Sequence, residues 1–152
     1  MRVHFQAEEI LNKKSGWKAL TGTTDFAQIA VEKFPSEAHK LAFDIVVDRM
    51  LGYIGNYYLK LGGEVDALVF AGGIGEKSAL LRQVLVEKSQ CLGFAIEAKA
   101  NEQGPEDDEV VKDISPASSN GPRVLICQTN EQVSVYKFRH ISTNSTQGIF
   151  VR

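Results

Sequence analysis

An apolar run that ends in clustered glycines is the feature that most limits how this chain can fold. Residues 68–78 read LVFAGGIGEKS, a short apolar stretch followed by three glycines within four positions. The nearly all-apolar run from Val65 to Phe70 predicts a strand buried on both faces, and residues 77–89 predict a helix. Glycine tolerates positive φ and has no Cβ, so a ligand can approach such a turn closely. Free N–H groups at the helix start suit a nucleotide or another anion, although a tight strand–helix turn that binds nothing has the same pattern.

Strands and helices alternate along the rest of the chain, which indicates an α/β fold with a mixed or parallel sheet. The spacing of apolar residues and the helix-ending signals predict helices over 4–14, 36–61, 77–89 and 130–140. Strands are expected over 65–70, 92–96, 110–114 and within 123–128, and loops over 17–26, 101–109 and 115–122. The long helix has one apolar stripe, formed by Phe43, Val47, Met50, Leu51, Ile54, Tyr58 and Leu61. Gly52 and Gly55 lower its intrinsic stability or let another backbone pack close.

Composition excludes several classes of function. The net charge is −2 and no basic block occurs, so a nucleic-acid surface has no electrostatic support. No apolar run is long enough to span a membrane, and the first 16 residues do not resemble a secretory signal. Cys91 and Cys127 lie in apolar company, which predicts buried, inert thiols and a reducing, cytoplasmic compartment. His4, His39 and His140 have no companions at metal-ligand or catalytic-triad spacing.

Local motifs leave the nucleotide open. A P-loop requires Gly-Lys-Ser/Thr, whereas here Lys77 follows Glu76. Residues 73–78 read GIGEKS, which departs from the dinucleotide fingerprint GxGxxG only at the last position. Glu97 follows at the end of the next expected strand, where a ribose-binding acid would stand. A Rossmann-type NAD-binding domain is therefore an alternative on pattern alone.

Four stretches together resemble the C-terminal third of acetate kinases: NKKSGWKALTGTTDF, LGGEVDALVFAGGIGEKS, the following LGF, and the late QTNEQ. The resemblance implies that residues 1–140 form part of the C-terminal lobe of an actin-like, Hsp70 and sugar-kinase (ribonuclease H-like) fold, with a polar tail over 141–152. It also implies transfer of the γ-phosphoryl group of ATP to acetate, giving acetyl phosphate and ADP with Mg²⁺. A homodimer is the implied assembly of the full-length family, with no nucleic-acid or membrane partner.

The resemblance also assigns site residues. The residues matched to the nucleotide site are Asp25, Phe26, Gly73, Ile74, Gly75, Glu76 and Lys77, and Glu131 is matched to the metal-associated glutamate. Two positions depart from the family pattern, because Ala27 stands where arginine is common and Lys77 where asparagine is common. Each assignment has a structural alternative: Asp25 as a helix cap, Phe26 as core, and Glu131 as a first-turn glutamate.

No stretch matches the arginines, histidines and aspartate that the family places at the phosphoryl and acetate site. The resemblance puts those residues in a missing N-terminal portion, so we expect no acetate phosphorylation by this chain alone. Exposed apolar surface and strand edges are expected where that portion would pack. A non-catalytic nucleotide-binding module that kept the fold without the chemistry is a further alternative.

Overall fold

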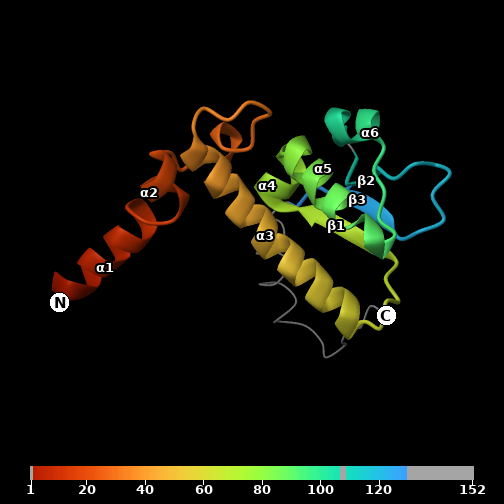
Figure 1. Ribbon diagram of the computed structural model, residues 1–152, viewed down its shortest axis with the longest axis horizontal. Coiled ribbons are helices and arrows are strands. Elements are labelled where there is room, and N and C mark those ends of the chain that lie inside the picture. Colours follow the sequence, from red (N-terminus) through yellow and green to blue (C-terminus); the bar gives the residue numbers. More distant parts are fainter. Residues whose placement is uncertain (1, 107–108, 130–152) are drawn as a thin grey trace, which may run out of the picture.

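A mixed three-stranded sheet organises the molecule, whose computed structural model describes residues 2–106 and 109–129 (Figure 1). The strands are β1 (Ala67–Ala71), β2 (Val111–Asp113) and β3 (Arg123–Cys127), in the order β1-β3-β2. β1 pairs with β3 in parallel, and β2 pairs with β3 antiparallel. The expected α/β class with a mixed sheet is therefore confirmed.

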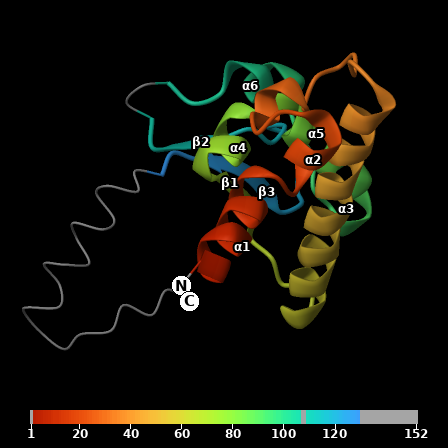
Figure 2. The same ribbon diagram turned by 90° about the vertical axis from the view of Figure 1, so that its left-hand side faces the viewer.

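The helices cover this sheet unevenly. Their bounds are α1 Arg2–Lys13, α2 Trp17–Thr21, η1 Phe26–Gln28, α3 Glu37–Lys60, α4 Gly72–Lys77, α5 Ala79–Lys88, η2 Gln90–Leu92 and α6 Ala98–Gln103. α5 contacts both α3 and α6. α1 projects away from the sheet in Figure 1, and in Figure 2, where that side faces the viewer, α1 lies in front. Within the described ranges, no helix has the length and apolar character needed to cross a membrane.

The core lies between one face of the sheet and the helices α3 and α5. Phe70 and Ile126 are paired across β1 and β3, and both are buried. Leu81 and Leu85 of α5 are fully buried in the same cluster. Since burying one large apolar side chain stabilises a fold by about 1.5–3 kcal/mol, this cluster determines how α5 sits on the sheet.

The other face of the sheet is open within the described part of the chain. Val69 of β1 is 51% exposed and Val111 of β2 is 49% exposed. The prediction that the first strand is buried on both faces was therefore wrong, because helices of residues 2–106 and 109–129 cover only one face of it. The expectation of exposed apolar surface is met on this open face. The expectation of exposed strand edges stays a prediction.

α3 follows its predicted course more closely than any other element. Ser36 is the N-cap residue, although its hydroxyl bonds to His39 Nδ1 at 2.8 Å and makes no capping bond. Gly62 and Gly63, with φ of 66° and 80°, end the helix in a conformation that favours glycine. Nothing lies within 4 Å of a Cβ built at Gly52 or Gly55, so no described backbone packs close there.

Local patterns failed in two of the predicted loops. Residues 17–21 form α2 inside the region expected to be turn-rich, and α6 occupies part of the expected acidic loop. α2 contacts α3, and the Glu97 carboxylate caps α6 by accepting from Lys99 N and Ala100 N. Tertiary contact and a cap therefore outweighed weak helix propensity in these short segments.

The strand expected over 92–96 is absent. η2 ends at Leu92, and the next residue, Gly93, has a φ of 89°, which is not an extended conformation. Cys91 in η2 is exposed and Cys127 is only partly buried, so the prediction of two buried thiols was also wrong. Apolar neighbours in the sequence therefore did not ensure burial of either thiol. The helix predicted over 130–140 and the tail 141–152 lie outside the described residues.

Gly121 should tolerate no side chain. A Cβ built there would lie 2.3 Å from the carbonyl oxygen of Gly93 and 3.2 Å from its carbonyl carbon. Because backbone atoms must shift to relieve this overlap, we expect Gly121→Ala to lower the free energy of unfolding by about 1–3 kcal/mol. Urea denaturation followed by circular dichroism measures this change.

Gly52→Ala is the matched control, because its Cβ would meet nothing within 4 Å. It should leave stability unchanged or raise it by roughly 0.5–1 kcal/mol, since alanine is the better helix former. Equal stability of the two variants would contradict the close approach of Gly93 and Gly121.

Candidate functional site

The carboxyl ends of the two parallel strands meet at one edge of the sheet. β1 continues directly into α4, and β3 continues into Gln128 and Thr129. This edge is where ligands bind in open α/β sheets, because the connections there leave a crevice. Gly72, with φ of 71°, makes the sharp turn from β1 into α4.

Thr129 joins α4 to the end of β3. Its hydroxyl oxygen accepts from the backbone N–H of Gly72 at 3.2 Å. Glu76 Oε1 accepts from both the backbone N–H and the hydroxyl of Thr129, each at 2.9 Å. These bonds, led by the one from the Thr129 backbone, lower the pKa of Glu76 below its ordinary value of 4.5. No role was assigned to Thr129 from sequence, because nothing in a linear pattern pairs it with a residue 53 positions earlier.

The glycine segment differs from its predicted form. Residues 72–77 are a helix rather than an open loop, and the Gly72 N–H is taken by Thr129 rather than left free. Gly75 is buried, with its Cβ position 3.3 Å from the backbone of Phe70. Gly73 instead has nothing within 4 Å of a Cβ and faces open space. Gly75 therefore allows α4 to pack closely on β1, and Gly73 leaves space beside the backbone of α4.

A cavity of about 680 Å³ lies beside this helix. Its lining residues come from residue 17 in α2, the segment around η1, and α4 with the start of α5: Trp17, Thr24, Asp25, Phe26, Ala27, Ala30, Glu32, Gly73, Ile74, Lys77, Ser78, Ala79 and Leu80. Five of the seven predicted nucleotide-site residues are among them, namely Asp25, Phe26, Gly73, Ile74 and Lys77. Gly75 and Glu76 do not line the cavity.

Asp25 and Phe26 each also have a structural role. Asp25 caps η1, accepting from Ala27 N at 3.0 Å and from Gln28 Nε2 at 3.3 Å. Phe26 is buried, with its ring 5.5 Å from that of Trp17 and 6.3 Å from that of Phe43. The cap and core alternatives for these residues are thus real, and they coexist with the place of both residues in the cavity wall.

Trp17 is the main wall residue that sequence reasoning missed. It is the only tryptophan of the chain, and its indole N–H lies 3.4 Å from the carbonyl of Thr24. A lone tryptophan eight positions before the Asp25-Phe26 pair was the available signal, but the segment was expected to be an irregular connection. Its place in a helix turns the ring toward Phe26 and the cavity.

Carboxylates for a metal are sparse. Glu131, the predicted metal-associated residue, lies outside the described residues. In the ranges 2–106 and 109–129, no three His, Cys, Asp or Glu side chains form a group that could hold a metal ion. Asp25 and Glu32 are the carboxylates of the cavity wall, and Asp25 is engaged as a cap.

The NAD-binding alternative loses its key residue. Glu97 follows no strand, both its carboxylate oxygens accept from the first turn of α6, and it is not in the cavity wall.

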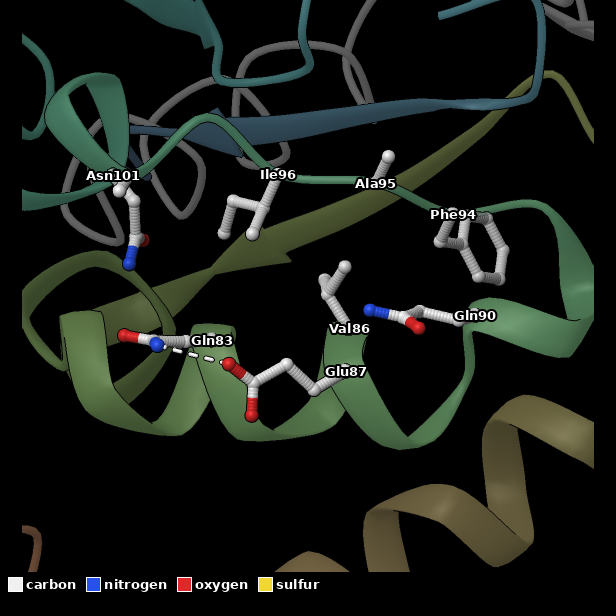
Figure 3. Close-up of a pocket in the computed structure, with 9 residues that line it drawn as sticks. Gln83, Val86, Glu87, Gln90, Phe94, Ala95, Ile96 and Asn101 are labelled. Atoms are coloured by element: carbon white, nitrogen blue, oxygen red, sulfur yellow. Dashed lines mark hydrogen bonds between the residues drawn. The ribbon is translucent and has the colours of Figure 1, made fainter.

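A second cavity, of about 310 Å³, lies between α5 and residues 94–101 (Figure 3). Glu87 is its one carboxylate, bonded by Gln83 at 2.9 Å, and apolar side chains such as Phe94 and Ile96 form much of the rest. Nothing in that lining indicates a particular ligand.

Sequence comparison identifies relatives that match most of this chain. The model of the Acetokinase family matches residues 3–137. A probable acetate kinase of Emericella nidulans is 68% identical over 127 residues, covering 83% of this chain and 30% of that protein. One from Neurospora crassa is 46% identical, covering 84% of this chain and 32% of that protein. The chain therefore spans about a third of the length of these relatives.

Solved structures agree in fold. Acetate kinase from Entamoeba histolytica matches with a TM-score of 0.76 at 23% identity, covering 90% of this chain and 36% of that one. Acetate kinase from Porphyromonas gingivalis matches with a TM-score of 0.72 at 28% identity, covering 90% and 34%. These matches confirm the expected actin-like lobe of acetate and sugar kinases, and with the family match over residues 3–137 they place this chain in the acetokinase family.

Proposed function

We propose that this chain forms the adenosine side of an ATP site in an acetate kinase. The reaction would be transfer of the γ-phosphoryl group of ATP to acetate, giving acetyl phosphate and ADP. One observation supports this most: two segments almost 50 residues apart, each matched to the family's nucleotide site, line a single cavity beside α4, the helix that follows directly from the carboxyl end of β1. Its volume of about 680 Å³ lies within the usual range for small-molecule sites, roughly 300–1,000 Å³.

The lining suits a nucleotide whose base lies among apolar groups. Trp17, Phe26 and Ile74 offer aromatic and aliphatic surface for a purine. The open Cβ position of Gly73 lets the nucleotide approach the backbone of α4. Lys77 is the cation of the described lining, and we assign it to the phosphates, in part replacing the arginine absent at Ala27. Glu76 does not contact the nucleotide in this proposal, since Thr129 occupies its carboxylate.

Mg²⁺ would accompany the nucleotide and neutralise its phosphate charge. We retain Glu131 as its associated carboxylate, because a hard oxygen ligand, through water, is what Mg²⁺ prefers. The position of Thr129 supports this, since it fixes the end of β3 beside α4 two residues before Glu131. Glu32 in the cavity wall is a second oxygen donor that fits this role.

The remaining parts of the proposal concern partners. Acetate as the acyl substrate, a preceding polypeptide that completes the lobe, and a homodimer of the whole protein follow from family membership. The open sheet face with Val69 and Val111 gives that polypeptide a surface to cover. A cytoplasmic location is part of the same proposal, and the two free thiols fit a reducing compartment.

A non-catalytic nucleotide-binding module is the second candidate, because the described cavity contains no arginine or histidine that could act on a phosphoryl group. The two candidates differ in one experiment. Adding the preceding two thirds of a relative restores acetate phosphorylation if this chain is a kinase segment, and does not if it is a separate module.

Nucleotide binding has a built-in reporter in Trp17, the sole tryptophan, which lines the cavity. We expect ADP to change its fluorescence in a saturable way. Gly73→Val should weaken ADP binding about tenfold or more, because the new side chain points into open cavity space; this equals roughly 1.4 kcal/mol.

Gly52→Val is the matched control for this experiment, since Gly52 is also helical with nothing within 4 Å of its Cβ, but lies on α3 outside the cavity. It should bind ADP as the original chain does. Equal affinity of both variants, or a response to NAD that depends on Glu97, would refute the proposed site.

The chain alone should form no acetyl phosphate. Incubated with ATP, Mg²⁺, acetate and hydroxylamine, it is expected to yield no acetyl hydroxamate, because positioning and charge neutralisation at the phosphoryl group require residues that it lacks. Product above that of a Glu131→Ala control would overturn this expectation.

The tether between Glu76 and Thr129 should depend on pH. Because the folded state lowers the pKa of Glu76, the stability it contributes is complete above the ordinary pKa of 4.5 and is lost as the pH falls through the lowered folded value. The Thr129 amide resonance should therefore titrate with a midpoint below 4.5, and Glu76→Gln should abolish that titration. Glu87→Gln, which alters another hydrogen-bonded carboxylate, is the control and should leave it unchanged. A Thr129 midpoint at or above 4.5 would contradict the tether.

A further inference from the structure

Arg82 is the largest fully buried side chain of the described structure. It lies in α5 and is only 2% exposed. Within the described ranges it makes no ion pair, so its charge is compensated by neutral acceptors alone. Burial lowers the pKa of the guanidinium, which nonetheless remains charged. A cation in this environment needs a physical reason, because desolvating it is costly.

Its hydrogen bonds join two separate parts of the fold. Nη1 donates to the carbonyl of Gly75 at 2.7 Å and to that of Glu76 at 2.8 Å. Nε and Nη2 donate to Oδ1 and to the backbone carbonyl of Asn101, both at 2.7 Å. Asn101 is itself held, since its Nδ2 donates to the carbonyl of Ala79 at 3.0 Å. Its amide lies beside the start of α5 in Figure 3.

The carbonyls that Arg82 binds are the ones that α4 cannot satisfy itself. α4 has six residues, and the last carbonyls of a helix have no partner within the helix. So short a helix is not stable alone, which means that contacts from outside fix its position. A positive charge at its carboxyl end is favourable, whereas an apolar side chain there would leave buried carbonyls unpaired.

We propose that Arg82 is a positioning residue of the nucleotide site, which holds α4 in place through the carbonyls of Gly75 and Glu76 while Asn101 orients its guanidinium. The functional half of this statement rests on the proposed nucleotide site, since Gly73, Ile74 and Lys77 of the same helix line the cavity. The structural half stands on the four hydrogen bonds alone.

Two tethers then act on one residue. Thr129 binds the carboxylate of Glu76 at the edge of the sheet, and Arg82 of α5 donates to the backbone carbonyl of Glu76. Glu76 is thereby fixed by side chain and backbone without lining the cavity. Loss of the Arg82 bonds should loosen the carboxyl-terminal turn of α4, including Lys77, more than the sheet.

The test compares local and global protection in the full 152-residue chain. Amide hydrogen exchange is measured by mass spectrometry over residues 72–78 and over residues 123–127 of β3. Arg82→Met should raise exchange in 72–78 roughly tenfold relative to β3, as expected for losing bonds to a charged donor. Arg82→Lys keeps the charge but cannot span both groups of acceptors, so it should restore part of that protection. ADP affinity, followed by Trp17 fluorescence, should be highest in the original chain, lower in Arg82→Lys and lowest in Arg82→Met.

Arg123→Met is the matched control. Arg123 is likewise a hydrogen-bonded arginine, which donates to the carboxylate of Asp113 and to the carbonyl of Pro116, but it is partly exposed on β3 and outside the cavity. It should change neither ADP affinity nor protection of 72–78 relative to the sheet residues 124–127. A folded Arg82→Met variant in which 72–78 and β3 lose protection equally would overturn the proposal.

Two further results, failure of Arg82→Met to fold and absence of ADP binding, have different consequences. If Arg82→Met does not fold, Asn101→Ala decides in its place, since it removes one guanidinium acceptor and leaves Arg82 present: selective loss of protection in 72–78 supports the proposal, and equal loss overturns it. If the original chain gives no fluorescence response to ADP, the nucleotide site is refuted. The exchange comparison still decides whether Arg82 positions α4.

Discussion

The parallel pairing of β1 with β3 is the interaction on which the site depends. Its register places Ala71 opposite Cys127, so the two strands end at the same level of the sheet. Only because of this alignment can Thr129 reach Gly72 and Glu76 with three hydrogen bonds. A slip of one residue would turn the buried side chains of β3 to the open face and separate α4 from Thr129. Core packing and site geometry are thus consequences of one register.

The sequence predicted the elements whose signals are strong and local. α3 has a long apolar stripe, a serine at its start and a pair of glycines at its end, and it was predicted almost residue for residue. β1 and β3 are apolar runs bounded by turns. Of the seven residues that family motifs matched to the nucleotide site, five line the cavity (Asp25, Phe26, Gly73, Ile74 and Lys77), whereas Gly75 and Glu76 do not. Their contact with a nucleotide stays a prediction.

What sequence could not supply are relations between distant residues. Arg82 stands in an amphipathic helix where its own pattern gives no sign of burial, and its acceptors lie on α4 and α6. Thr129 similarly has meaning only once β3 is paired with β1. The failed strand at 92–96 is a similar case, because Gly93 has a φ of 89° and lies against Gly121, a contact between residues far apart in the sequence. Periodicity reports which face is apolar, but it does not report which backbone carbonyl needs a donor.

The cavity wall is not separate from the core. Phe26 is at once core packing against Phe43 and part of the lining, and Asp25 both caps η1 and borders the same space. Substituting either residue would therefore change stability and binding together, and neither can report on the ligand alone. Gly73 and Lys77 differ, because one has free space at its Cβ position and the other projects from an exposed turn. Substitutions at Gly73 and Lys77 are therefore the ones that test ligand binding with the least effect on stability, because neither side-chain position is needed for packing or capping.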